Sequence, residues 1–438
     1  MSEKQVIVVG GGLAGSEAAY YLASHGIKTT LIEMKPKKFT PAHESEKYCE
    51  LVCSNSLKSN DIYANACGLL KEEMRRLGSM VIAAADATKV PAGAALAVDR
   101  EKFSAFVTEK LKSCPNLTLV NEEVTKIPEV EKDGDRYVII ATGPLTSEAL
   151  SQDILSLVGG GLHFYDASAP IVSAESIDMT CAFTGDRYGK GTGDYINCPM
   201  SKDEYYAFVD ELLQAEKVEL HEFEKREIFE GCMPIEVMAS RGRETLRFGT
   251  LKPVGLSDED GKRPYAVLQL RKENEEGTTY NLVGFQTNLK FPEQKRVFSM
   301  IPALKNADYL RYGVMHRNTY IQSPDVLNAD FSFKNNRRIF FAGQITGVEG
   351  YVESAMSGLL AAIHITDEIL KRPTHVFDER TVCGALEKYI STPNKDFQPM
   401  NANFGILAPM PVRIRDKKER YHALAERSLS AIEEIVKE

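Results

Sequence analysis

The N-terminal stretch that ends at Glu33 constrains the fold more than any other part of the sequence. Lys4–Val9 is a short, mostly β-branched apolar run, which predicts a buried parallel strand. Gly10–Gly15 follows at once and fits the pattern G-x-G-x-x-G. Ser16–Ser24 predicts a helix, and Lys28–Ile32 predicts a second strand that leads directly into Glu33. This order of elements predicts a dinucleotide-binding unit, with an ordinary glycine-rich turn as the alternative.

Each residue type in this unit has a mechanical role. Gly10 makes the tight turn, Gly12 lets the backbone approach a pyrophosphate, and Gly15 lets the helix pack against the strand. The helix N-terminus supplies free N–H groups to the phosphates, and the Glu33 carboxylate is placed to accept hydrogen bonds from a ribose. The pattern alone does not separate FAD from NAD. The predicted cofactor residues of this unit are Gly10, Gly11, Gly12, Leu13, Ala14, Gly15 and Glu33.

After this unit the spacing of apolar residues predicts two helices, one over 67–80 with Gly78 at its stop and one over 99–111 with Asp99 as its N-cap.

Two later segments repeat the arrangement of a strand followed by a glycine turn. Tyr137–Ile140 leads into Ala141, Thr142 and Gly143, a turn that lies near the nucleotide in flavoproteins with two dinucleotide folds. Arg338–Phe341 leads into a turn with Gly343 and Gln344, and a helix rich in small residues is predicted over 349–370. Small residues let a helix and a cofactor approach closely, so this unit is expected to close the second side of a flavin. A plain β-turn-α unit is the alternative.

The residues between these segments differ in character. They combine a glycine-rich, charged stretch at 184–195 that is expected to be a surface loop, a predicted helix at 203–214 and predicted strands within 264–291. We therefore expect an α/β protein: a Rossmann-type FAD-binding domain, GR2-like in architecture, with an inserted smaller mixed α/β domain. The expected division is 1–160 for the first part of the FAD-binding domain, 161–325 for the insertion, and 326–438 for the second part with C-terminal helices.

Composition narrows the cellular setting. The chain has 438 residues and a formal net charge of −9, which argues against wholesale coating of nucleic acid while leaving room for a local basic surface. No apolar run is long enough for a membrane span, and the first strand leaves no room for a signal peptide, so a cytoplasmic protein is expected. The eight cysteines show no metal-binding spacing and are expected to be reduced thiols. No metal site is predicted.

Several longer motifs make a family resemblance. They are GGGLAGSEAA at 10–19, CSNSLKS at 53–59, EGCMPIEVMA at 230–239, GFQTNLK at 284–290, FAGQITGVEGYVESAMSGLLAA at 341–362 and NFGILAP at 403–409. Together they resemble the TrmFO family of folate- and FAD-dependent tRNA (uracil-5-)-methyltransferases, and the resemblance covers essentially the whole chain. The more distant GidA/MnmG family of tRNA wobble-uridine modifiers shares the N-terminal loop and the FAGQ-type segment. MnmG chains carry a long extra C-terminal helical region for which this chain is too short.

The resemblance implies a reaction. A methylene group passes from 5,10-methylenetetrahydrofolate to C5 of the uridine at position 54 in the tRNA T-loop, reduced FAD supplies electrons, and NAD(P)H re-reduces the flavin. The product is 5-methyluridine. The chain carries no second G-x-G-x-x-G for NAD(P)H, which suits a transient reductant. The expected partners are tRNA, folate and NAD(P)H, with no membrane, and a monomer or weak dimer.

Two cysteines stand out against this chemistry. Uracil C5 becomes nucleophilic when a thiolate adds at C6, so a cysteine nucleophile is expected. The resemblance assigns functional roles to Cys53 and Cys232. We assign Cys232 as the C6 nucleophile and Cys53 as its partner near the flavin, and the exchanged assignment stays open. By composition alone any one cysteine is more often a small buried apolar residue, and most of the eight are expected to be that.

The substrate contacts are less specific. Pterin rings stack on flat groups, so His316 and Tyr351 are candidates for the folate pocket, with ordinary packing as the alternative. Phosphates need cations, and two basic groups are candidates for tRNA binding. The first group is Arg241, Arg243, Arg247 and Lys252, and the second is Arg413, Arg415, Lys417 and Lys418 with Arg420. A solvated charged face is the alternative for each group.

Three other functions remain possible on this sequence. An MnmG-like wobble-uridine modifier would work with a GTPase partner. A general NAD(P)H:flavin oxidoreductase would turn over a small acceptor without tRNA. A flavin-bound RNA-binding scaffold would keep its function when Cys53 or Cys232 is changed to Ala.

Overall fold

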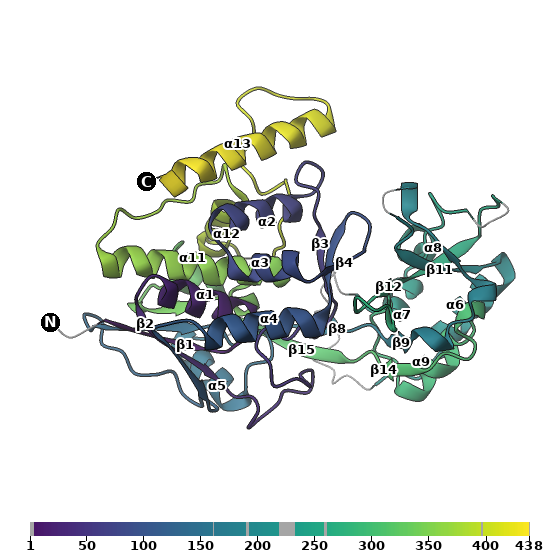
Figure 1. Cartoon of the computed structure of the whole chain (residues 1–438), viewed down its shortest axis with the longest axis horizontal. Helices are drawn as coiled ribbons and strands as arrows, with labels where there is room; N and C mark the ends of the chain where they lie inside the picture. The colour runs from purple at the N-terminus through teal and green to yellow at the C-terminus, as the bar shows by residue number, and fades with distance from the viewer. Residues whose placement is uncertain are drawn as a thin grey trace.

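Two lobes make up the molecule, and Figure 1 shows them side by side with β8 and β15 running between them. The computed structural model describes residues 4–160, 162–189, 192–218, 233–257, 261–395 and 397–437; for residues 162–167, 315–317 and 319 it describes the backbone alone. Each lobe has its own apolar core. The first core draws on residues from Val6 to Ile435, and the second draws on residues from Val172 to Ala307.

The first lobe is built on a six-stranded sheet. In spatial order its strands are β16 (Ser332–Phe333), β17 (Asn336–Phe341), β7 (Arg136–Ile140), β1 (Gln5–Val9), β2 (Lys28–Glu33) and β6 (Leu117–Asn121). All neighbouring pairs are parallel except β16 with β17. The five parallel strands therefore run in the order third, second, first, fourth, fifth, which is the order of a doubly wound dinucleotide-binding sheet. The predicted Rossmann-type fold is confirmed.

Helices cover both faces of this sheet. Figure 1 shows α1, α4 and α11 on one side and α5 on the other, with α13 outermost. The helices of the first lobe are α1 (Leu13–Ser24), α2 (Ala66–Arg76), α3 (Met80–Ala87), α4 (Arg100–Lys112), α5 (Glu148–Val158), α10 (Ser323–Val326), α11 (Tyr351–Leu370), α12 (Val382–Ser391) and α13 (Lys417–Lys437). The helix α11 packs closely on α1, because a Cβ on Gly358 would lie 2.1 Å from the carbonyl oxygen of Ala14.

The second lobe carries an antiparallel sheet. In spatial order its strands are β10 (Phe183–Thr184), β11 (Tyr195–Met200), β12 (Ala266–Lys272), β13 (Thr279–Leu282), β9 (Ile171–Ser173) and β14 (Tyr309–Arg311). Its helices are α6 (Lys202–Gln214), α7 (Ile235–Ser240), α8 (Thr245–Phe248) and α9 (Phe291–Phe298). A ribbon of β8 (Leu162–Ala167) and β15 (Met315–Tyr320) connects the lobes, and β3 (Ser56–Ser59), β5 (Ala95–Val98) and β4 (Lys89–Val90) form a small third sheet.

Buried carboxylates fasten helices to one another inside the first lobe. Glu17 of α1 accepts hydrogen bonds from the backbone N–H groups of Met80 and Val81 at 2.9 and 2.8 Å, at the start of α3. Glu73 of α2 does the same for the first N–H groups of α12. Burial raises the pKa of Glu17 to about 7, and these hydrogen bonds oppose that rise. Each carboxylate satisfies N–H groups that a helix start leaves without partners.

Several elements differ from the sequence-based expectations. The helix expected over 67–80, with Gly78 as its stop, is present as α2, which ends at Arg76 just before that glycine. The separate helix α3, which begins after Gly78 with Ser79 as its cap, was not predicted. In the glycine-rich stretch at 184–195, expected to be a surface loop, only the end residues Thr184 and Tyr195 belong to strands, β10 and β11, and residues 190–191 lie outside the described part of the chain. The helix expected over 99–111 is present as α4, and Asp99 is its N-cap as predicted. The domain limits at 160/161 and 325/326 stay a prediction.

Helix length and apolarity also bear on membranes. Within the described part of the chain, the helices include none that could cross a bilayer.

The contact between α1 and α11 yields a test of the packing. Replacing Gly358 by Ala puts a Cβ against the backbone of Ala14. A backbone atom cannot relieve the contact by a change of rotamer, so the two helices must move apart. We expect Gly358→Ala to lower the free energy of unfolding by about 1–3 kcal/mol, measured by denaturant titration. Gly185→Ala is the matched control, because the nearest atom to its Cβ lies at an ordinary 3.6 Å. Equal midpoints for both variants would contradict this account of the helix contact.

Candidate active site

A cleft opens where the strands of the first sheet end. The turns after β1, β7 and β17 all line it, with Gly10–Ala14, Ala141–Ser147 and Gly343–Gln344 forming its walls. The empty space of the cleft is about 1070 Å³, open solvent at its mouth included. Ligands of doubly wound sheets bind in the crevice at the carboxyl ends of the strands, so this is the expected place for a dinucleotide.

The glycine turn has the geometry that a bound pyrophosphate needs. Gly10 has a φ of +103°, and a Cβ there would lie 2.5 Å from the carbonyl oxygen of Ala141. A Cβ on Gly15 would lie 1.9 Å from the carbonyl oxygen of Gly10, so only glycine lets α1 start this close to the strand. Gly12 is exposed and has open space around its Cβ position. The turn is therefore closely packed at Gly10 and Gly15 and open at Gly12, an arrangement that fits the phosphates of FAD.

Glu33 stands at the end of β2 in the cleft wall and is 9% exposed. One carboxylate oxygen accepts a hydrogen bond from the backbone N–H of Gly11 at 2.7 Å, and the other accepts one from Lys35 at 3.0 Å. Each oxygen keeps a second lone-pair site. The carboxylate is thus fixed by the backbone and still able to accept from the hydroxyl groups of a ribose.

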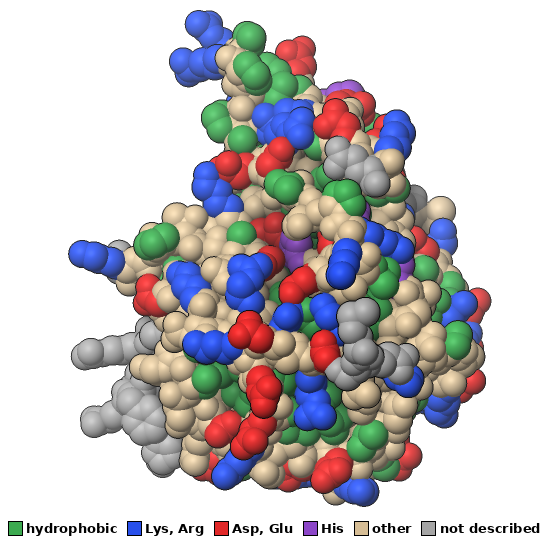
Figure 2. Space-filling view, turned by 90° about the vertical axis from the view of Figure 1, so that its left-hand side faces the viewer, with side chains coloured by type: hydrophobic (Ala, Val, Ile, Leu, Met, Phe, Trp, Pro, Cys, Tyr) green, Lys and Arg blue, Asp and Glu red, His purple; other side chains and the backbone are tan. Residues whose placement is uncertain are grey.

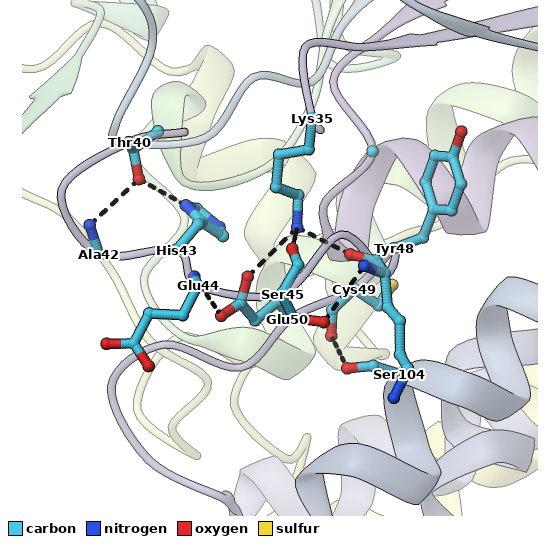
Figure 3. Close-up of polar contacts among 12 residues, drawn as sticks. Lys35, Thr40, Ala42, His43, Glu44, Ser45, Tyr48, Cys49, Glu50 and Ser104 are labelled. Atoms are coloured by element: carbon cyan, nitrogen blue, oxygen red, sulfur yellow. Dashed lines mark hydrogen bonds and ion pairs between the residues drawn. The ribbon is translucent and has the colours of Figure 1, made fainter. Parts of the chain in front are cut away.

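The long loop after Glu33 forms another wall, and sequence reasoning did not identify its individual residues. Figure 3 shows Lys35 at its centre: the ammonium group donates to the carbonyl oxygens of Ser45 and Lys47 at 2.9 and 2.7 Å and pairs with Glu50 at 3.2 Å. The lysine side chain is buried, so its charge is satisfied entirely within the loop. A lysine in a polar, proline-containing stretch gave no signal of this role, because its partners lie ten and more residues away.

The same loop presents polar groups to the cleft. Thr40, His43 and Glu50 line it, and a ring nitrogen of His43 lies 2.6 Å from the hydroxyl of Thr40 (Figure 3). On the opposite wall, the backbone N–H of Gly343 donates to the hydroxyl of Ser357 at 2.7 Å. The Gln344 amide donates to Glu349 at 2.5 Å. These contacts hold the β17 turn in place beneath the space for a flavin.

The structure brings together nearly all of the predicted cofactor residues. Those that line the cleft are Gly10, Gly11, Gly12, Leu13, Ala14, Glu33, Thr142, Gly143, Gly343 and Gln344. Gly15 lies beneath the turn and acts through packing. Their contacts with a bound cofactor stay a prediction, since they rest on this arrangement alone.

Cys53 lies beside the cleft and is tied to its wall. The hydroxyl oxygen of Tyr351, at the start of α11, accepts hydrogen bonds from the backbone N–H groups of Cys53 and Ser54 at 2.8 and 3.1 Å. Tyr351 itself lines the cleft. Burial raises the pKa of Tyr351, and the charge of a Cys53 thiolate acts in the same direction. The cysteine and the flavin-side wall are therefore held by one side chain.

The other described cysteines fit the prediction of small buried groups. Cys49, Cys67, Cys114, Cys198 and Cys383 are buried, and Cys181 is half-buried. Burial raises the pKa of Cys49 to about 12, which leaves its thiol protonated and unreactive at neutral pH.

Some predicted residues fall outside the described part of the chain. Cys232 lies there, within 219–232, and its role stays a prediction. His316 lies on β15, opposite Asp166 in the ribbon, but its side chain is not among those described. The folate roles of His316 and Tyr351 therefore also stay predictions.

The two basic groups differ in their surroundings. In the first, Arg243 forms an ion pair with Asp210, and Arg247 pairs with Glu244 and lies 4.2 Å from the ring centre of Tyr265. Much of its charge is thus balanced locally. In the second group Arg413, Arg415, Lys417 and Lys418 are exposed, and no described carboxylate pairs with them within 4 Å. Figure 2 shows Lys and Arg side chains at the upper end of the molecule, where the segment before α13 lies in Figure 1.

Among the described residues, no group of three or more His, Cys, Asp or Glu side chains is arranged to hold a metal ion.

Substitution of Gly12 should change cofactor binding without changing the fold. Its φ of −76° suits any residue, and its Cβ position is empty. We expect Gly12→Ala and Gly12→Val to leave the unfolding midpoint of the flavin-free protein unchanged. Both should lower FAD affinity, the Val variant by at least about tenfold (~1.4 kcal/mol), measured by flavin fluorescence titration. Gly185→Ala serves as the control, and unchanged affinity in Gly12→Val would exclude this turn as the phosphate site.

Comparison with known proteins places the chain among relatives. A family model described as "Glucose inhibited division protein A" matches residues 5–373. The curated protein "Methylenetetrahydrofolate--tRNA-(uracil-5-)-methyltransferase TrmFO" of Acetivibrio thermocellus is 57% identical over 432 residues, 98% of each chain. The protein of the same name from Staphylococcus carnosus is 55% identical over 437 residues, 99% of each chain.

Among solved structures, GidA of Aquifex aeolicus in its form II crystal superposes with a TM-score of 0.69 at 17% identity. The match covers 99% of this chain and 74% of that one, and at this identity it supports the fold alone. The match in fold agrees with the sequence identity of 55–57% to the curated relatives over nearly the whole chain. The chain therefore belongs to the TrmFO family, within the wider group described as glucose inhibited division protein A.

Proposed function

We propose that this chain is a folate- and FAD-dependent tRNA methyltransferase that forms 5-methyluridine at position 54 of the T-loop. The carbon comes from 5,10-methylenetetrahydrofolate, and NAD(P)H provides the electrons through the flavin. The printed names of the full-length relatives support the substrate and the carbon donor. One structural observation carries the proposal: Tyr351 lines the cofactor cleft and at the same time holds the backbone of Cys53.

The chain's own residues would hold FAD along the cleft. The N–H groups of the glycine turn and the start of α1 would bind the pyrophosphate, and Glu33 would bind the adenosine ribose. The turn with Gly343 and Gln344 would face the flavin ring, beside Tyr351. When bound and reduced by NAD(P)H, the flavin would supply the two electrons that convert a transferred methylene group into a methyl group. The protein's task is to orient the ring against the folate and to exclude water.

Cysteine chemistry activates the uridine. A thiolate that adds to C6 of uracil pushes electron density to C5, which then bonds to the methylene carbon as the bonds of that carbon to the folate nitrogens break. The proton on C5 must leave and the C6–S bond must break to restore the C5=C6 double bond and release the thiolate. We assign the addition to Cys232 and proton transfer or handling of the methylene group to Cys53. If the two roles are exchanged, Cys53→Ala rather than Cys232→Ala reduces the label to background in the assay below.

The tRNA must reach this site with its target base exposed. The T-loop uridine is stacked in the tRNA elbow, so we expect it to flip out at a cost of roughly a few kcal/mol. The net charge of −9 means that the phosphates must find a local basic surface. The second basic group, around Arg413 and Arg415, supports such a surface better than the first, in which Arg243 and Arg247 already form ion pairs. We place the enzyme in the cytoplasm as a monomer or weak dimer.

A methylene-transfer assay tests the proposal. It combines protein, FAD, NADPH, unmodified tRNA and 5,10-methylenetetrahydrofolate labelled in the methylene group. We expect label in the T-loop uridine of tRNA, loss of label to background with Cys232→Ala, and strong reduction with Cys53→Ala. Cys181→Ala is the matched control, because this half-buried cysteine belongs to the second lobe, and it should retain activity.

The outcomes separate the alternatives. Rapid NADPH oxidation without label would replace the proposal by a general flavin oxidoreductase. Label at the anticodon wobble position that depends on a GTPase would indicate a GidA-type modifier. Full activity in both cysteine variants would exclude the thiolate mechanism.

The second basic group gives a test of tRNA binding. We expect the double variant Arg413→Glu, Arg415→Glu to raise the Kd for tRNA by about tenfold or more at moderate salt, because phosphate contacts release counterions. The slope of log Kd against log salt should fall in parallel. The control is Lys110→Glu, Lys112→Glu, which makes the same charge change on the exposed side of α4. Equal losses in both double variants would show a general charge effect and remove this group from the binding surface.

A further inference from the structure

The segment that carries Cys53 is held by residues from both lobes. Arg271, on β12 of the second lobe, donates from its Nη2 to the hydroxyl of Ser54 at 2.7 Å. Its Nε donates to the side-chain oxygen of Asn55 at 2.8 Å. The amide of Asn55 in turn donates to the carbonyl oxygens of Val98 at 2.9 Å and Lys272 at 2.8 Å. Asn55 is fully buried, and Arg271 is 7% exposed.

A second guanidinium group reaches the same segment from another side. Arg100, at the start of α4, donates to the carbonyl oxygen of Leu51 at 2.6 Å and forms an ion pair with Glu273. Glu273 is 5% exposed, and its ion pair with Arg100 balances its charge. No carboxylate among the described residues lies within ion-pair distance of Arg271. A buried cation without a paired anion costs several kcal/mol, so the surroundings of Arg271 favour an anion.

Cys53 is a neighbouring group that can add a negative charge there besides that of Glu273. A thiolate at Cys53 would raise the pKa of both Arg100 and Arg271. Burial lowers the pKa of Arg271, and Glu273, Tyr195 and the thiolate of Cys53 are the groups that oppose this change. Cations near a cysteine favour its reactive thiolate, which is how proteins activate such groups.

We propose that Arg271 is a positioning residue that holds the Cys53 segment against the cofactor cleft and supplies the positive charge opposite the Cys53 thiolate. The inference rests on the proposed function only for what the thiolate then does. Arg271 belongs to the second sheet and Cys53 to the first lobe, so the reactive form of the cysteine depends on the two lobes being docked. The resemblance to a family motif at 53–59 did not point to this arginine.

The groups that face this segment set its pH response. They are Tyr351 from α11, Arg100 from α4, Arg271 and Glu273 from β12, and Tyr195 from β11 beside Arg271. Tyr351 is kept neutral by the rise of its pKa, and Arg100 is paired with Glu273. Arg271 is therefore the charge whose removal should change the titration of the thiol most.

The test measures the alkylation rate of each cysteine by iodoacetamide against pH, using peptide mass spectrometry on the FAD-loaded protein. In the wild type, Cys53 should react at lower pH than Cys181 in the same molecule. Arg271→Gln keeps a hydrogen-bond donor and removes the charge. We expect it to move the Cys53 profile upward by about one pH unit or more, which is about a tenfold slower reaction at neutral pH. Arg271→Lys should restore most of the wild-type profile.

Matched controls exclude a general loss of structure. Arg187→Gln removes a half-buried arginine of the same lobe that donates to the carbonyl oxygen of Lys252 at 2.8 Å, and it should leave the Cys53 profile unchanged. The Cys181 profile should be the same in all variants. A wild-type Cys53 profile in Arg271→Gln would overturn the inference, as would equal shifts at Cys53 and Cys181.

Two further results keep the inference separate from the proposed reaction. A shifted Cys53 profile in a protein that transfers no label to tRNA would support the role of Arg271 and discard the methyltransferase. If Arg271→Gln does not fold, the wild type alone decides the matter: reaction of Cys53 at the same or higher pH than Cys181 would overturn the inference.

Discussion

The close approach of α1 to the first glycine turn and to α11, which leaves no room for a Cβ atom, is the constraint on which the rest of the structure depends. Gly15 lets α1 start against the carbonyl oxygen of Gly10, and Gly358 lets α11 lie against Ala14. With α1 fixed in this way, the ends of β1, β7 and β17 share one edge and the cleft opens between them. A single methyl group at either close contact would push apart the walls that hold a cofactor, because interiors packed this densely transmit small displacements.

The first unit could be predicted from the sequence because its logic is local. The strand, the glycines, the helix and Glu33 follow one another, and each has a residue type that the geometry demands. The turns at Thr142 and at Gly343 were found for the same reason. The stop at Gly78 was predicted, but the new helix α3 after it was not, since only the capping hydrogen bond of Ser79 marks the new start. The limits of the lobes and the catalytic roles of Cys53 and Cys232 remain predictions.

What the sequence could not show are contacts between residues far apart in the chain. Lys35 reads as a solvated lysine, yet it is buried and braces the loop that lines the cleft. Glu73 lies in a run of charged helix residues, yet it caps a helix that begins at Val382. Arg271 sits in a strand whose apolar neighbours give no hint that its partner is the Cys53 segment. In each case a buried charge is satisfied by a partner that only the folded topology brings near, and no local pattern encodes that partner.

The position of β17 has a consequence for how the protein comes into being. The sheet of the first lobe takes its fifth parallel strand from residues 336–341, and the helix that completes the cleft follows at Tyr351. A growing chain therefore makes four of these strands early and waits through the whole second lobe for the last one. Pairings this distant in sequence form slowly and leave apolar edges uncovered meanwhile. The cleft lacks its last wall until β17 and α11 have been synthesised. The flavin therefore binds late in biosynthesis, between two parts of the lobe that were made at different times.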